Sequence, residues 1–251
     1  MDFNITDVDT FIVFLRSVLQ VVPGQIAGAK FEVGTESTEV KVVNESKTVR
    51  SYFTTNSITA EEDTVFFFQD ITKLLKSVSL IRDIEENKTA TLKFDTQFIR
   101  YNNNVKFKLK VVMAAAVERY CTTPITAKLT PIYSFVTGQD QIKKIIQCTG
   151  IVDDTDARVY FSKHNEGIIA EIDDKRNKLT DSVGLPISDK VTGEVTEVVC
   201  VSFDNFRHFT ILPVDNIVVI LTDKKVVMIN SKYTRGDKYI DMNMICSLSK
   251  G

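Results

Sequence analysis

The chain has 251 residues, of which 43% are hydrophobic and 25% are charged, and its formal net charge is −2 at pH 7. No run approaches the ~20 apolar residues of a membrane-spanning helix, and the N-terminus lacks the basic start of a signal peptide, so we expect an intracellular protein with no membrane partner. A protein that holds nucleic acid by affinity alone usually has a strong basic excess. If this chain works on DNA, its basic residues must be concentrated on one face, or its hold must be topological.

The cysteines and histidines are too dispersed to indicate a metal centre. Four cysteines lie at positions 121, 148, 200 and 246, with no C-x-x-C pair, and the two histidines are His164 and His208. A zinc site needs clustered ligands, so we predict free thiols in a reducing compartment, no metal site and no cofactor.

Four segments have the apolar spacing of amphipathic helices. In chain order they are residues 8–21, 68–79, 139–148 and 203–210. The first carries Phe11, Leu15 and Val18 on one stripe, and Pro23-Gly24 should end it. Each helix also carries basic residues on its polar side.

Most of the remaining chain alternates between apolar and polar residues, as half-buried antiparallel strands do. Pairs of predicted strands flank short turns: 40–43 and 48–53, 98–101 and 105–111, 158–162 and 168–172, and 217–221 and 226–230. A last strand is predicted over 239–248, and short strands in long loops over 171–197. The fold class is therefore α+β, with helices packed on antiparallel sheets.

A short pattern recurs about half a chain apart. The run from Phe68 to Leu74 reappears from Phe203 to Phe209, and each copy follows an apolar run and begins a basic helix. We therefore predict two similar domains, 1–119 and 132–251, joined by a linker over 120–131 in which Pro124 and Pro131 restrict the backbone.

These features resemble the sliding DNA clamps with two domains per subunit and three subunits per ring, the type found in eukaryotes, archaea and tailed phages. The resemblance spans nearly the whole chain. Its local matches are 14–19, 71–78, Lys143-Lys144, 164–168 and 206–210 followed by Pro213. Arg16-Ser17 stands where the family has two adjacent basic residues, and the acidic C-terminal tail of the eukaryotic protein is missing. Both departures favour a divergent viral or phage member.

The resemblance implies that basic helix residues line a channel for DNA. Long flexible cations contact phosphates at any register and read no sequence, which suits sliding. The candidates share a position on a predicted helix: Arg16, Lys73, Lys76, Lys143, Lys144, Arg207 and His208. A single basic residue on an amphipathic helix usually just belongs to its solvated face. The layout of four helices is what supports a DNA-binding role for the whole set.

The resemblance also implies a partner groove and a ring interface. The groove would lie beside the linker and take a short polymerase peptide, with Val40, Val42, Ile125, Leu129 and Tyr233 as candidates. Tyr239 is an alternative to Tyr233. Ring closure would pair the strand at 105–113 with an edge strand near 179–185 of the next subunit.

The leading hypothesis is a homotrimeric sliding clamp that encircles double-stranded DNA, acts as a polymerase processivity factor and is placed by a clamp loader. It would work in the cytoplasm of a bacterial host, or in a nucleus or cytoplasmic replication site. A second hypothesis is a monomeric or dimeric processivity subunit with a clamp-like fold that holds DNA by charge. A third is a β-rich structural or virion protein. An enzyme is not expected, because no catalytic constellation is present.

Overall fold

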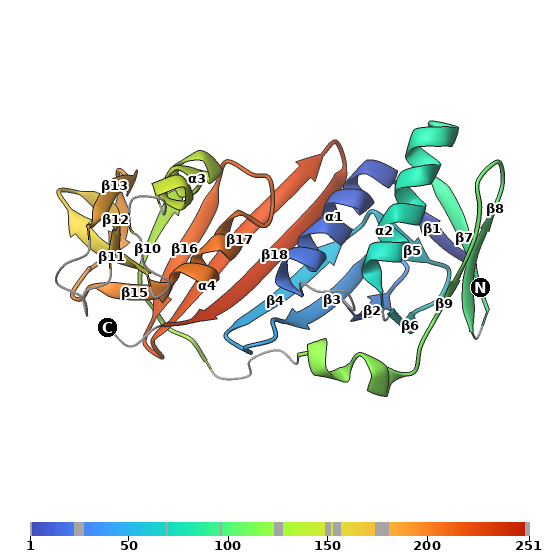
Figure 1. Ribbon diagram of the computed structural model, residues 1–251, viewed down its shortest axis with the longest axis horizontal. Coiled ribbons are helices and arrows are strands. Elements are labelled where there is room, and N and C mark those ends of the chain that lie inside the picture. The colour runs from blue at the N-terminus through green and yellow to red at the C-terminus, as the bar shows by residue number, and fades with distance from the viewer. Residues whose placement is uncertain are drawn as a thin grey trace. The chain divides into compact units, whose positions relative to one another are not determined.

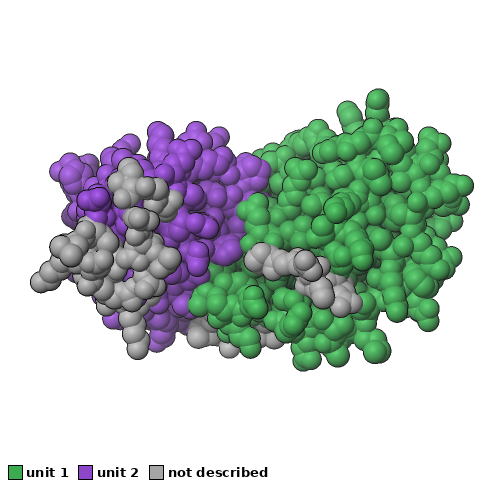
Figure 2. Space-filling model, viewed as in Figure 1, with its two compact units in different colours: residues 1–125, 233–242 green, residues 126–232, 243–251 purple. Residues whose placement is uncertain are grey.

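The computed structural model describes residues 2–22, 28–68, 70–95, 97–122, 128–148, 152, 157–173 and 181–248. The chain forms two compact units (Figure 2). Unit 1 comprises residues 1–125 and 233–242, and unit 2 comprises residues 126–232 and 243–251. The domain boundaries expected from the sequence stay a prediction.

Aspartates cap the helices described in unit 1, whose ribbons are drawn in Figure 1. Asp7 accepts a hydrogen bond from the third backbone N–H beyond it at 2.6 Å and begins α1 (Val8–Val21). Asp70 does the same at 3.1 Å and begins α2 (Ile71–Leu80), which continues into a π-helical turn, η1 (Ile81–Glu85). A capping carboxylate satisfies an N–H that the first turn leaves free. The caps therefore fix which side chains of each helix face the core.

Unit 1 contains two antiparallel sheets. The first runs in the order β5-β1-β7-β8-β9, with bounds Ile58–Ala60, Asp2–Ile5, Ala90–Phe94, Phe98–Asn102 and Lys106–Lys110. The second runs in the order β6-β2-β3-β4-β18, with bounds Thr64–Phe68, Ala29–Val33, Thr38–Val43, Val49–Thr55 and Lys238–Ser247, of which residues 238–242 belong to unit 1. Two 3-10 turns, η2 (Ala114–Ala116) and η3 (Glu118–Tyr120), follow β9.

A cluster of phenylalanines joins the helices and sheets of unit 1. Phe14 of α1 contacts Phe31 and Phe53, each with ring centroids 6.2 Å apart. Phe66 stacks on Phe31 at 5.0 Å and contacts Phe3 of the other sheet at 4.9 Å. All five rings are essentially inaccessible to solvent. Truncating one such ring typically costs about 3–5 kcal/mol, so this cluster is the main anchor of α1 and both sheets.

Residues 233–242 are held in unit 1 by hydrogen bonds to the end of β4. Asn56 donates to the carbonyl of Asp237 and accepts from the N–H of Tyr239, both at 2.9 Å. The hydroxyl of Thr55 donates to the carbonyl of Tyr239 at 2.7 Å. A segment near the C-terminus thus completes a sheet made of N-terminal residues.

The described residues of unit 2 form two sheets and two short helices. One sheet runs β13-β12-β11-β15, with bounds Val183–Ser188, Gly167–Asp173, Arg158–His164 and Val199–Ser202. The other strands run in the order β14-β10-β16-β17, with bounds Val191–Gly193, Pro131–Thr137, Ile217–Thr222 and Val226–Arg235, of which residues 226–232 belong to unit 2. The helices are α3 (Gln139–Gln147) and α4 (Phe203–Arg207), the latter continued by the 3-10 turn η5 (His208–Thr210).

Phe161 of β11 is the centre of the unit 2 core. Its ring contacts Phe135 of β10 at 5.7 Å, Phe206 of α4 at 6.0 Å and Phe209 of η5 at 6.2 Å. Gln139, at the start of α3, donates through its amide nitrogen to the carbonyls of Thr210, the last residue of η5, and of Leu212, each at 3.3 Å. Ring packing and this amide together fix α3 beside the α4 turn.

The α+β fold class is confirmed, and so are the four helices, with one correction. The second helix, predicted from Phe68, begins at Ile71, because residues 64–68 pair with β2 as strand β6. In the second copy of the repeat the helix begins directly at Phe203, since Ser202 caps it at 3.3 Å. The two copies are therefore out of phase: Phe68 ends a strand, whereas Phe203 begins a helix.

The carboxylate of Glu85 ties the end of η1 to the β8–β9 hairpin. It accepts hydrogen bonds from the Tyr101 hydroxyl, the Val105 N–H at 2.7 Å, and the amides of Asn103 at 3.2 Å and Asn87 at 2.8 Å. Partial burial acts to raise the pKa of Glu85, but these hydrogen bonds outweigh it, so the pKa lies below its ordinary value.

We predict that Glu85→Gln lowers the thermal unfolding midpoint by several degrees at neutral pH. Because the folded-state pKa is depressed, the carboxylate stabilises the fold above its ordinary pKa of 4.5, and this contribution disappears as the pH falls through the folded-state value. The difference between wild type and variant should therefore shrink from about pH 7 to about pH 3, followed by circular dichroism. Glu86→Gln, which removes the same charge from the exposed neighbour, is the control; equal effects of the two variants would contradict this role for Glu85.

Candidate nucleic-acid interface

Three cations project from the helices of unit 1 into solvent. Arg16 lies on α1, and Lys73 and Lys76 lie on α2, and all three are exposed. The opposite sides of the helices are buried, including Leu15 of α1 and Leu74 of α2. The two helices lie side by side (Figure 1). We call the three cations the helix face of unit 1.

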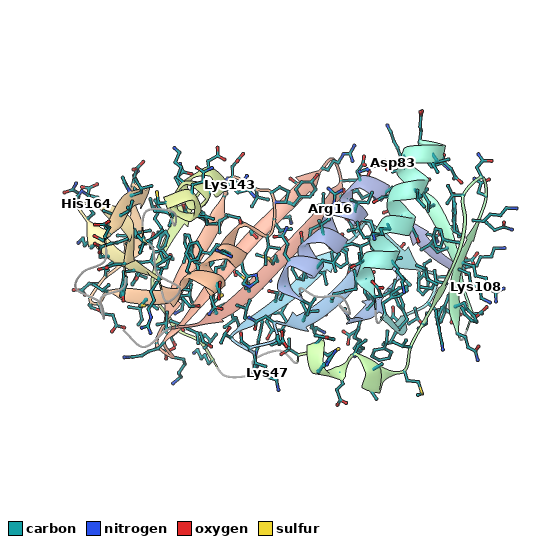
Figure 3. The ribbon with its side chains drawn as sticks, in the orientation of Figure 1. Arg16, Lys47, Asp83, Lys108, Lys143 and His164 are labelled. Atoms are coloured by element: carbon teal, nitrogen blue, oxygen red, sulfur yellow. The ribbon has the colours of Figure 1, made fainter. Side chains whose placement is uncertain are left out.

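Nearby acids reduce the charge of this face. Lys73 lies 3.3 Å from Asp70, although its own side chain is 72% exposed. On η1, Arg82 donates to Asp83 at 2.7 Å, and Figure 3 shows Asp83 on the same side of unit 1 as Arg16. The pKa of Asp83 lies below its ordinary value, mainly because Arg82 donates a hydrogen bond to it. Burial opposes this with a smaller effect, and the charges of Arg82 and Arg16 lower the pKa further. Asp83 is therefore an anion beside Arg16 at neutral pH.

Arg82 and Asp83 were not among the residues predicted from the sequence. The predicted helix stopped at residue 79, whereas the helical turn continues through η1 to Glu85. The signal that could have found them is Ile81, which is fully buried and extends the apolar stripe of α2 by one turn. Asp9, in the first turn of α1, forms a further ion pair with Arg235, which neutralises its charge.

The cations of unit 2 are exposed in the same way. Lys143 and Lys144 lie on α3, where Ile142 and Ile145 face the core. The ammonium of Lys143 donates to the Gln139 side chain at 2.8 Å (Lys143 is labelled in Figure 3). Lys144 has no hydrogen bond or ion pair within the part of the chain that the structure describes.

Arg207 and His208 are neighbours in sequence but differ in charge. Arg207 is exposed, and its guanidinium lies over the ring of Phe203 at 4.6 Å, which orients it on α4. His208 is half-buried, and burial lowers its pKa below the ordinary value, with a smaller opposing effect from Asp204. The imidazole is therefore mainly neutral at pH 7 and supplies little charge to a phosphate.

The residues predicted for the partner groove lie in different environments. Val40 and Val42 of β3 are fully buried, so they belong to the core of unit 1 and offer no surface to a partner. Ile125 lies outside the described residues. Leu129 and Tyr233 are half-buried and keep some exposed surface. Burial thus corrects the prediction for the two valines and leaves it untested for the other residues.

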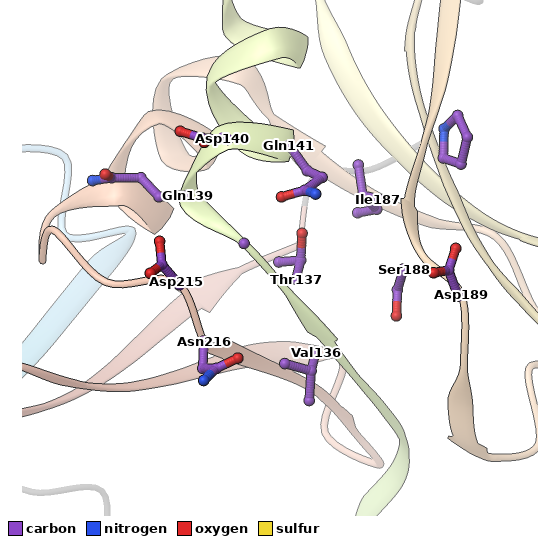
Figure 4. Close-up of a pocket in the computed structure, with 12 residues that line it drawn as sticks. Val136, Thr137, Gln139, Asp140, Gln141, Ile187, Ser188, Asp189, Asp215 and Asn216 are labelled. Atoms are coloured by element: carbon purple, nitrogen blue, oxygen red, sulfur yellow. The ribbon is translucent and has the colours of Figure 1, made fainter.

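A hollow of about 440 Å³ lies at the start of α3 in unit 2 (Figure 4). It is lined by three carboxylates, from Asp140, Asp189 and Asp215. Acidic groups repel phosphates, so this hollow does not extend the basic surface of α3.

Across the described ranges, no group of three or more His, Cys, Asp and Glu side chains is placed to hold a metal ion. Among the same residues, no helix is both long and apolar enough to cross a membrane.

Known proteins resemble the chain in structure but not detectably in sequence. No protein-family model and no curated protein matches it. PCNA of A. fulgidus, solved with the C-terminal region of FEN-1, matches with a TM-score of 0.76 and 14% identity, over 100% of this chain and 99% of that one. Proliferating cellular nuclear antigen of Entamoeba histolytica matches at 0.73 and 9%, over 99% and 98%.

The beta clamp of Helicobacter pylori also matches over the whole chain. A complex with a DNA ligase peptide gives a TM-score of 0.64 and 12% identity, and this chain spans 67% of that one. Identities this low show the fold alone. The chain therefore has the fold of the sliding DNA clamps, which confirms the fold implied by the sequence resemblance.

We predict that His208 makes folding stability depend on pH. Its folded-state pKa lies below the unfolded value of about 6.5, so the unfolded chain binds the proton more readily, and stability falls as the pH drops below about 6.5. In His208→Gln this part of the loss should disappear, measured as the shift of the thermal midpoint between about pH 7 and about pH 5. His164→Gln, which replaces the other histidine of the chain, is the matched control. An unchanged slope in His208→Gln would contradict the neutral, half-buried imidazole.

Proposed function

We propose that the protein is a sliding clamp: a homotrimeric ring that encircles double-stranded DNA without reading its sequence. The observation that carries this proposal is the placement of six exposed cations on the polar sides of four helices, in a chain with the clamp fold and a net charge of −2. The six are Arg16, Lys73, Lys76, Lys143, Lys144 and Arg207. A net charge of −2, with no excess of basic residues, suits a topological hold better than a grip by charge.

The helix cations would contact phosphates rather than bases. Lysine and arginine neutralise the DNA backbone at any register, so binding energy changes little as the protein moves along the duplex. Asp83, ionised beside Arg16, would limit this attraction further. Weak, sequence-independent contact is what a ring that slides requires.

Ring closure would use free sheet edges. β9 stands at one end of its sheet in unit 1, and β13 stands at one end of its sheet in unit 2. Antiparallel pairing of β9 with β13 of a neighbouring subunit would satisfy the open N–H and C=O groups of both edges. The interface is heterologous, so three copies must close through a fixed rotation.

The ring would tether a DNA polymerase and other replication proteins, and a clamp loader would place it on DNA. The A. fulgidus and Helicobacter pylori structures contain partner segments, from FEN-1 and DNA ligase respectively. On this chain the tether would dock beside the linker near Ile125, Leu129 and Tyr233. The protein would itself catalyse no reaction, need no cofactor and act where DNA is replicated inside a cell.

We predict that neutralising the helix face of unit 1 weakens duplex binding. The variant Arg16→Gln/Lys73→Gln/Lys76→Gln should lower affinity for a linear duplex roughly ten-fold or more at low salt, and flatten the plot of log affinity against log salt by about 2 to 3 per subunit. The measurement is fluorescence anisotropy of a labelled duplex across a salt series. Lys88→Gln/Lys163→Gln/Lys190→Gln removes the same charge at exposed positions off the helices and is the control.

The control variant should bind like the wild type. Equal losses in both variants would mean that net charge alone, and not the helix face, attracts DNA. Unchanged binding in the helix-face variant would reject these residues as the DNA surface.

A further inference from the structure

Five cations share one face of the β7–β8–β9 sheet in unit 1, and the DNA channel proposed above does not include them. They are Lys93 of β7, Arg100 of β8, and Lys106, Lys108 and Lys110 of β9, and all are exposed. We call them the sheet face. Figure 3 shows Lys108 at the margin of unit 1, away from Arg16. The sheet face is therefore separate from the helix face.

Strand pairing brings these cations together in rows. Lys93 lies opposite Arg100, and Arg100 lies opposite Lys108, so three cations stand side by side across three strands. Opposite residues of antiparallel strands lie on the same face, within about 5.5 Å of each other. Like charges in this position repel, so the row destabilises the sheet unless an anion covers it.

The core does not require this arrangement. The alternate residues on the same strands, such as Leu92 and Ile99, point inward and are buried, so the apolar half of the pattern is complete without the cations. Lysines are common on edge strands, where they limit uncontrolled pairing, so the three lysines of β9 would carry no argument by themselves. That role does not extend to Lys93 and Arg100, because β7 and β8 have neighbours on both sides.

An aromatic ring lies among the cations. Phe98 of β8 is half-exposed on the same face, opposite Lys110. The ammonium of Lys108 lies 3.6 Å from the centre of its ring, and the guanidinium of Arg100 lies 5.6 Å from it. Cations around a partly exposed ring on a sheet are a combination that binds single-stranded nucleic acid, because phosphates pair with the charges and a base stacks on the ring.

Acids compensate only part of this charge. Asp95 pairs with Arg100 at 2.8 Å, while its other oxygen accepts from the N–H groups of Gln97 and Phe98 at 3.0 and 2.8 Å. Asp2 of β1 lies opposite Lys93. Within the described residues, no salt bridge joins the remaining three lysines to an acid.

We propose that the sheet face binds a short segment of single-stranded nucleic acid. The sheet face is about 10 Å wide across its three strands and about 14 Å long along residues 106–110. These dimensions suit a few nucleotides of a single strand and are smaller than the width of a duplex. A base of a single strand can stack on Phe98 once it displaces the Lys108 ammonium from the ring, whereas a base held inside a duplex stack cannot. The site is independent of the channel proposed for duplex DNA.

The test is the binding of a labelled oligo(dT) of about 12 nucleotides, followed by fluorescence anisotropy across a salt series. Lys93→Gln/Arg100→Gln/Lys108→Gln should weaken binding roughly ten-fold or more and flatten the salt dependence by about 2. The helix-face variant and the Lys88/Lys163/Lys190 control should bind oligo(dT) like the wild type. Thermal unfolding of each variant establishes that it is folded.

Two further variants test whether binding depends on positive charge and on the aromatic ring, rather than on a general disturbance of the sheet. Lys93→Arg/Lys108→Arg keeps the charge and should bind like the wild type, whereas Phe98→Leu keeps the apolar bulk and should weaken binding about five-fold or more. The proposal is overturned if the glutamine variant binds like the wild type, if an equal-length duplex competes as well as the single strand, or if polyglutamate displaces the oligonucleotide as effectively. The last result would assign the face to an acidic peptide. Failure here leaves the duplex result of the helix-face variant unchanged, so the two proposals are tested separately.

Discussion

Burial of the apolar side of each helix is the constraint on which the candidate interface depends. Helix α1 has 14 residues and α4 has five, lengths at which an isolated helix is marginal or unstable in water. Their positions are therefore set by packing. Phe14 packs α1 against the rings of two strands, and Phe206 packs α4 against Phe161. Once the apolar side is buried, the 3.6-residue period places Arg16 and Arg207 in solvent.

Hydrogen bonds fix the positions of exposed segments that the aromatic packing does not reach. Glu85 holds the β8–β9 hairpin against the end of η1, and Asn56 holds residues 237–239 against β4. In both cases one polar side chain satisfies backbone groups of a segment distant in sequence. These contacts carry less energy than the aromatic cores, but they fix the geometry of exposed segments, including the sheet that carries Lys93, Arg100 and Lys108.

The sequence predicted features that depend on periodicity and missed those that depend on tertiary partners. The stripe through Phe11, Leu15 and Val18 predicted α1 with the bounds that the structure has. The second helix was started too early, because pairing with β2 extends a strand to Phe68, and no local signal encodes that pairing.

Site residues divide in the same way. Polar positions on amphipathic helices, such as Lys73 and Lys144, could be predicted as exposed from spacing alone. The burial of Val40 and of His208 depends on what packs over them, which spacing does not reveal. The alternation of Lys106, Lys108 and Lys110 was visible, but their alignment with Arg100 and Lys93 follows from strand order and pairing.

The central claim, a closed ring of three subunits, is tested most directly by native mass. Light scattering on a size-exclusion column should be recorded over a dilution series, with and without a short duplex. A ring of three subunits should have a mass of three times 28.3 kDa in the free protein, and the trimer should persist on DNA. A mass of 28.3 kDa for the free protein at every concentration, together with a complex of one chain and one duplex when DNA is present, would contradict the ring and favour a processivity subunit that holds DNA by charge.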